Sequence, residues 1–223
     1  MFRWGFNMRK YLLNIILMLN IFFIPIFTVH ADDNISTKCF SFRKGQLSLQ
    51  MITGVFDSPF LFSPERQEMD YLQTNLRIGL ILSDLQDPKY FFRGNWEGIF
   101  EITYSDVEGR TDGYFGGGAI LLRYNILSLE SRRVYPFIHL GAGIVYNDLY
   151  KDRSQSVIGQ SIEFTLRGGV GIRLKITDCW SIDLEGAYEH ISNGGLAERN
   201  AGLNAVGGFV GITRYFDWSV GEP

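Results

Sequence analysis

Residues 180–192 read WSIDLEGAYEHIS, and apolar and polar side chains alternate along most of this stretch. One face holds Trp180, Ile182, Leu184 and Tyr188, and the other holds Ser181, Asp183, Glu185 and Glu189. Because successive side chains of a β-strand point to opposite faces, this alternation predicts a strand. One of its faces is apolar and aromatic, whereas the other carries full charges at mid-strand.

Seven further segments alternate in the same way, which gives a predicted total of eight strands. They cover approximately residues 47–55, 72–82, 92–104, 114–125, 138–146, 162–174 and 203–216. Their polar faces carry charges of both signs, which predicts ion pairs among Arg77, Arg93, Arg123, Arg167, Arg173, Glu97, Glu101, Glu163, Asp183, Glu185 and Glu189. The adjacent glycines Gly207 and Gly208 interrupt the last segment and predict a β-bulge there.

The composition and the connections decide how these strands close. The chain is 46% hydrophobic and 15% aromatic, yet after residue 31 no stretch without Asp, Glu, Lys or Arg is longer than the 14 residues of Val134–Asn147. A multi-helix membrane protein is excluded, because a spanning helix needs about 20 apolar residues. Connections near 83–89, 128–133 and 177–179 are short, whereas 56–69, 106–112, 147–160 and 192–202 are mostly longer and polar. We therefore expect an all-β fold, an eight-stranded antiparallel transmembrane β-barrel of outer-membrane type, with a soluble β-rich domain as the alternative.

The N-terminal segment has a different character. Basic Arg3, Arg9 and Lys10 precede the apolar run Tyr11–Val29, and the small residue Ala31 stands at the expected cleavage site. This pattern predicts a signal peptide over 1–31 and a barrel domain over 32–223. An uncleaved anchor helix is the alternative. Without residues 1–31 the chain is more acidic than its formal net charge of −3, so nucleic acid is not an expected partner.

The two cysteines, Cys39 and Cys179, could pair or remain free thiols. Neither CxxC nor a histidine cluster is present, so no metal site and no cofactor are expected.

One short segment at the end of the seventh strand carries residues suited to chemistry. His190 and Ser192 lie two residues apart, so they share the apolar, lipid-facing side of that strand. A histidine can take the hydroxyl proton as the serine oxygen attacks an ester carbonyl. Asn193 and the backbone amides of Gly194 and Gly195 could donate hydrogen bonds to the resulting oxyanion. The alternative is a chance His-x-Ser where a strand enters a loop.

His190-x-Ser192-Asn193, followed by a glycine-rich loop and Asn200-Ala-Gly-Leu-Asn204, resembles the lipid A 3-O-deacylase (PagL) family. The resemblance implies an eight-stranded barrel in the outer membrane of a Gram-negative bacterium. It also implies a serine-type ester hydrolase that removes the 3-O-linked acyl chain of lipid A. In that scheme His190 and Ser192 are catalytic, and Asn193 and Gly194 stabilise the oxyanion.

The sequence departs from the family at the third catalytic position. The family has a glutamate there, whereas this chain has Asn204. An amide oxygen can orient the imidazole of His190 but cannot stabilise an imidazolium by charge. Glu189 is expected to point into the barrel, away from the ring, and Glu198 in the loop is the weaker alternative acid.

The expected partner is lipid A or lipopolysaccharide in the outer leaflet, and a homodimer stays open. Basic residues could meet lipid A phosphates or be solvated loop charges: Arg66, Arg110, Lys151, Arg153 and Arg199. Two other functions remain as alternatives. One is a non-catalytic small barrel with a structural or surface-binding role, and the other is a narrow channel.

Overall fold

The computed structural model describes residues 42–58, 69–85, 93–109, 111–127 and 133–216. The chain divides into two units, residues 1–37 and 38–223. The first unit, and with it the predicted signal peptide, lies outside the described residues. Cys179, in the short turn before the seventh strand, is disulfide-bonded, whereas Cys39 lies outside the described residues. No helix in the described part of the chain is long and apolar enough to cross a membrane.

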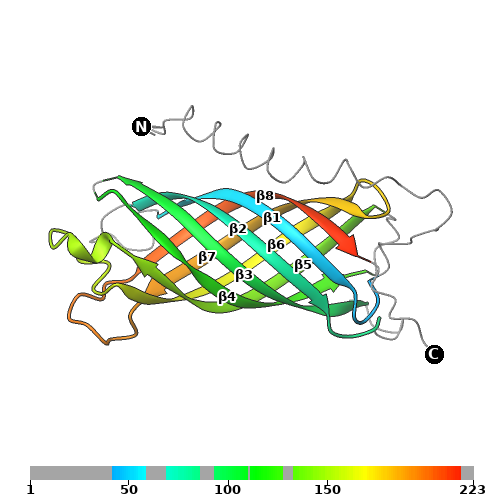
Figure 1. Ribbon diagram of the computed structural model, residues 1–223, viewed down its shortest axis with the longest axis horizontal. Coiled ribbons are helices and arrows are strands. Elements are labelled where there is room, and N and C mark those ends of the chain that lie inside the picture. Colours follow the sequence, from blue (N-terminus) through cyan, green and yellow to red (C-terminus); the bar gives the residue numbers. More distant parts are fainter. Residues whose placement is uncertain (1–41, 59–68, 86–92, 110, 128–132, 217–223) are drawn as a thin grey trace. The chain divides into compact units, whose positions relative to one another are not determined.

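Eight strands pair antiparallel with their neighbours in chain order, and the first also pairs with the last, so the sheet closes into a barrel (Figure 1). This closure confirms the predicted fold class. The strands are β1 (Leu47–Asp57), β2 (Met69–Ile81), β3 (Gly94–Gly109), β4 (Gly113–Ile126), β5 (Val134–Asn147), β6 (Ile162–Lys175), β7 (Trp180–Ser192) and β8 (Leu203–Phe216). A short 3-10 helix, η2 (Leu149–Lys151), lies between β5 and β6.

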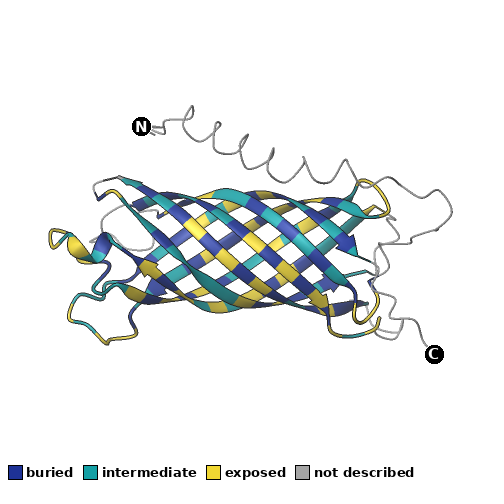
Figure 2. Cartoon of the chain, in the orientation of Figure 1, coloured by how far each residue is buried: buried dark blue, intermediate teal, exposed yellow. Residues whose placement is uncertain are grey.

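The alternation read from residues 180–192 separates the inside of the barrel from its outer wall (Figure 2). Ser181, Asp183 and Glu185 are buried, whereas Ile182 and Leu184 are exposed. Exposed apolar side chains recur on every strand of the barrel. A continuous apolar wall of this kind is stable against lipid and unfavourable against water.

Ion pairs fill the middle of the barrel, as the sequence predicts. Arg77 Nε lies 2.6 Å from Glu101 Oε2, and Arg77 Nη1 lies 2.7 Å from Glu185 Oε2. The second oxygen of Glu101 accepts from Arg167 Nη1 at 2.7 Å. Arg173 Nε contacts Asp183 Oδ1 at 3.0 Å. Because these charges are removed from water, each must be paired to avoid a desolvation cost of several kcal/mol.

Two of the predicted ion-pair partners differ from expectation. Glu163 accepts from the backbone N–H groups of Gly159 and Gln160, each at 3.1 Å, rather than from an arginine. It is the second residue of β6, where this strand leaves the connection that follows β5. Among the described residues no ion pair of Arg93 occurs, and this residue directly precedes β3.

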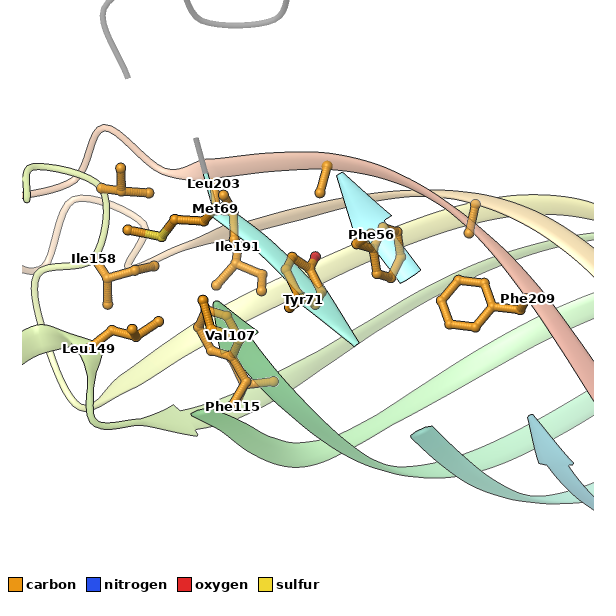
Figure 3. Packing of buried hydrophobic residues seen from close by; sticks show 14 of the residues in the cluster. Phe56, Met69, Tyr71, Val107, Phe115, Leu149, Ile158, Ile191, Leu203 and Phe209 are labelled. Carbon is orange, nitrogen blue, oxygen red and sulfur yellow. The ribbon is translucent and has the colours of Figure 1, made fainter. Parts of the chain in front are cut away.

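The barrel interior also contains an apolar cluster that the sequence analysis missed (Figure 3). Phe56, Tyr71 and Phe115 project inward and pack with Leu149 and Ile158 of the β5–β6 connection (residues 148–161). The cluster lies at the end of the barrel that carries this connection and the β7–β8 connection (residues 193–202), which we call the long-loop end. The residues of this cluster share the inward faces of their strands with polar residues. Their apolar character alone therefore did not show that their side chains point into the barrel.

The predicted bulge at Gly207 and Gly208 is wrong. Both glycines pair in continuous register with β1 on one side and β7 on the other. A Cβ on Gly207 would lie 2.7 Å from the ring of Phe56 and 2.6 Å from the Val55 carbonyl oxygen. A glycine at this inward position therefore makes room for a large ring of the apolar cluster.

We expect Gly207→Ala to lower the free energy of unfolding by about 1–3 kcal/mol, because its methyl group overpacks Phe56. Gly208→Ala is the matched control, since a Cβ there meets nothing within 4 Å. Equilibrium unfolding in urea, with the protein in detergent micelles, measures both variants. Equal stability of the two variants would contradict this packing role.

Candidate active site

The predicted catalytic side chains meet on the outer wall at the long-loop end. His190 and Ser192 are the last outward-facing residues of β7, and both are partly buried. Asn204, the second residue of β8, stands directly opposite His190 in the strand register. The alternation of β7, which the structure confirms, therefore puts His190 and Ser192 on the lipid-facing side. The strand register places Asn204 beside His190 on the same side.

The three side chains form one hydrogen-bonded chain. His190 Nδ1 lies 2.7 Å from Asn204 Oδ1, and His190 Nε2 lies 3.0 Å from Ser192 Oγ. Because a carbonyl oxygen only accepts hydrogen bonds, the proton of the neutral ring belongs on Nδ1. The lone pair on Nε2 then faces the serine hydroxyl. This is the arrangement in which a histidine can deprotonate a serine.

The turn after Ser192 is organised by Asn193, whose side chain is buried. Its Oδ1 accepts from the N–H of Gly195 at 2.9 Å, and its Nδ2 donates to the Arg199 carbonyl oxygen at 2.9 Å. Gly194 and Gly195 adopt φ values of +64° and +86°, which favour glycine. The side chain of Asn193 thus maintains the turn beside the serine. Among the described hydrogen bonds, none uses the Gly194 N–H.

The β5–β6 connection supports this turn from the side. The Arg199 guanidinium donates to the carbonyl oxygens of Tyr150 at 2.6 Å, Asp152 at 2.8 Å and Gln155 at 3.1 Å. The backbone N–H of Gly202 also donates to the Val157 carbonyl oxygen at 3.1 Å. Contacts between these two connections therefore hold in place the chain on either side of the predicted catalytic residues.

These contacts correct the interpretation of Arg199 as a lipid phosphate ligand, because its guanidinium is engaged by backbone carbonyls. Lys151 and Arg153 are exposed, as solvated loop charges would be. Arg66 and Arg110 lie outside the described residues.

Neither nearby glutamate makes a described hydrogen bond to the His190 ring. Glu189 is buried and accepts from Tyr71 Oη at 2.8 Å and from Arg167, which confirms its inward direction. Glu198 is exposed in the β7–β8 connection. Close to that connection, hydrogen bonds from Thr111 and Ser154 lower the pKa of Asp152. Asp152 contributes its carbonyl oxygen to Arg199, so it belongs to the support of the site.

The surroundings of the catalytic chain are apolar and open. On β6, Leu166 stands opposite His190 and Phe164 stands opposite Ser192, and they are 56% and 47% exposed. On the other side Gly202, at φ +72°, approaches the ring, since a Cβ there would lie 3.1 Å from His190 Cε1. In the described part of the chain, no group of three or more His, Cys, Asp or Glu side chains could hold a metal ion.

A closed barrel with an apolar wall defines a small outer-membrane barrel, and this one carries a hydrogen-bonded Ser–His–Asn chain on that wall. A profile of the lipid A 3-O-deacylase (PagL) family matches residues 75–213, which include the second half of β2, all of β3 to β7, most of β8 and all of the site. This chain belongs to the lipid A 3-O-deacylase family, and it is a protein of the Gram-negative bacterial outer membrane.

The chain is similar to solved structures at low sequence identity. The outer membrane enzyme PagL is 19% identical, with a TM-score of 0.51, and the match covers 74% of this chain and 97% of that one. Neisserial surface protein A is 12% identical, with a TM-score of 0.48 and coverage of 76% and 97%. Ail of Yersinia pestis is 15% identical, with a TM-score of 0.45 and coverage of 78% and 99%. The comparison with curated proteins gave no match.

We expect Arg199→Gln to loosen both long connections, because three carbonyl oxygens lose their donor. Amide hydrogen exchange should become faster across residues 149–160 and 194–202 and stay unchanged in the strands. Arg153→Gln, which removes an exposed charge from the same connection, is the control. Equal exchange in the two variants would show that Arg199 does not support the site.

Proposed function

We propose that this chain hydrolyses the 3-O-linked acyl ester of lipid A, with Ser192 as nucleophile and His190 as general base and acid. The observation that carries the proposal is the hydrogen-bonded chain Asn204–His190–Ser192 on the outer wall of the barrel. Membership of the lipid A 3-O-deacylase family supports the substrate and the bond.

The first half of the reaction forms an acyl-enzyme. Ser192 Oγ attacks the ester carbonyl carbon while its proton passes to His190 Nε2. The tetrahedral intermediate carries a negative oxygen, which the Gly194 N–H is suited to receive because no described hydrogen bond uses it. The bond between the acyl carbon and the ester oxygen then breaks, and His190 gives its proton to that oxygen, which leaves as the 3-hydroxyl group of the sugar.

The second half releases the fatty acid. Water attacks the acyl-Ser192 carbonyl and gives a proton to His190 Nε2. The second tetrahedral intermediate expels Ser192 Oγ, which regains the proton from His190. Atoms and charge balance over the cycle, since one ester and one water become a hydroxyl group and a carboxylic acid. In this scheme Asn193 acts by maintaining the turn that presents the Gly194 N–H.

The position of the site fits a membrane lipid better than a water-soluble ester. A lipid that diffuses in the outer leaflet would reach Ser192 sideways, between Phe164 and Leu166, with its acyl chains in the apolar phase. We take the long-loop end to face the cell exterior, as the longer connections of outer-membrane barrels do.

A homodimer, which the sequence left open, stays a prediction.

The deciding experiment expresses the wild type and Ser192→Ala in a Gram-negative host and compares the mass of its lipid A. The wild type should produce lipid A that lacks one 3-O-linked acyl chain, and Ser192→Ala should leave lipid A intact. Ser156→Ala, an exposed serine in the β5–β6 connection, is the matched control and should behave like the wild type. Heat-modifiable migration on gels verifies that each barrel is folded.

Unmodified lipid A with folded wild type, across several lipid A structures, would contradict the proposal. That outcome would favour a non-catalytic barrel with a structural or surface-binding role.

We also expect Asn204→Asp to raise kcat at least about 10-fold, because a carboxylate stabilises the imidazolium that forms on His190, whereas an amide only orients the ring. The two side chains have the same shape, so the 2.7 Å contact to Nδ1 can be retained. Initial rates with purified protein in detergent micelles measure the change. A fall in kcat in the folded variant would show that the neutral amide is required at this position.

A further inference from the structure

We propose that Tyr188 is a positioning residue for this reaction, acting through the side-chain amide of Asn204. This inference rests on the proposed function. The hydroxyl group of Tyr188 donates to Asn204 Oδ1 at 2.7 Å, and the same oxygen accepts from His190 Nδ1 at 2.7 Å. One amide oxygen thus receives two donors from neighbouring outward positions of β7.

The direction of the Asn204 amide decides whether His190 can act as a base. With Oδ1 toward the ring, the imidazole proton lies on Nδ1 and Nε2 is free to accept the Ser192 proton. With the amide reversed, Nδ2 would donate to Nδ1 and the ring proton would move to Nε2. The histidine would then donate to Ser192 Oγ and could not deprotonate it.

Reversal of the amide would oblige the Tyr188 oxygen to accept from Nδ2 instead of donating to Oδ1. Because a phenol is a stronger hydrogen-bond donor than acceptor, Tyr188 favours the productive direction. The strand register makes this contact diagonal: Tyr188 stands opposite Val206 on β8, whereas His190 stands opposite Asn204. A tyrosine two residues before the catalytic histidine is long enough to reach that amide from the same face.

The requirement for Tyr188 follows from the asparagine itself. A carboxylate presents an oxygen whichever way it rotates, so it needs no second donor to fix its direction. An amide carries an oxygen at one end and an NH2 group at the other, so it needs a second donor to fix its direction. The side chain of Tyr188 is 41% exposed on the outer wall, and it is not a member of the buried apolar cluster. Removal of the Tyr188 hydroxyl therefore tests the orientation of the Asn204 amide with little effect on packing.

The test is a double-mutant cycle in detergent micelles, with wild type, Tyr188→Phe, Asn204→Asp and the double variant. In the asparagine background, Tyr188→Phe should lower kcat about 5-fold or more and leave KM unchanged. In the aspartate background, the same substitution should change kcat less than about 2-fold, because the carboxylate needs no orientation. Tyr104→Phe is the matched control, since Tyr104 is also exposed and outward-facing but lies on β3. Wild-type kcat for Tyr188→Phe, or the same loss in both backgrounds, would overturn the inference.

A second measurement separates this inference from the proposed function. Nitrogen-15 spectra of histidine-labelled protein report the tautomer of His190, with His190→Gln used to assign its signal. The wild type should show the Nδ1–H tautomer, and Tyr188→Phe should show a mixture of tautomers. An unchanged tautomer in Tyr188→Phe overturns the positioning role whether or not lipid A is cleaved. Loss of the tautomer preference in a protein without deacylase activity would retain the role and reject only the proposed function.

Discussion

The carboxylate of Glu101 is the interaction on which most of the barrel depends. One oxygen accepts from Arg77 of β2 and the other from Arg167 of β6, so a single buried acid connects three strands. Each arginine in turn holds an acid of β7, Glu185 or Glu189. A slip of one residue in any of these strands would turn a full charge toward the lipid and an apolar side chain toward the charged interior. Each of these changes would destabilise the barrel. The ion pairs therefore fix the register, and the register places Asn204 opposite His190.

Much of the fold could be predicted from the sequence, because alternation with a period of two directly reports which face a residue occupies. The observed bounds of β8 agree with the predicted strand at 203–216, and the outward direction of His190 and Ser192 was predicted as well. The third strand is longer than expected, since β3 continues to Gly109 through residues assigned to a loop. The pattern inverts there, because Asp106 and Glu108 take the outward face while the apolar Val107 points inward to the apolar cluster.

The remaining features depend on contacts between distant segments. The sequence does not show that Arg199 ends among the carbonyl oxygens of Tyr150, Asp152 and Gln155, because backbone acceptors carry no residue signature. The apolar cluster was missed for a related reason. Phe56 follows the polar residues of β1 on the same inward face, and only the folded β5–β6 connection supplies Leu149 and Ile158 to cover it. The link from Tyr188 to Asn204 was missed because a strand pattern specifies faces and not diagonal neighbours.

The location of the hydrogen-bonded chain on the outer wall also determines the kinetics of a hydrolase built this way. Its reactants arrive and its products depart by lateral diffusion, so the barrel needs no tunnel, gate or exit path. The relevant substrate concentration is then a mole fraction in the leaflet rather than a molarity in solution. Dilution of the substrate with other lipids would slow such an enzyme even at constant bulk concentration, a behaviour known as surface dilution.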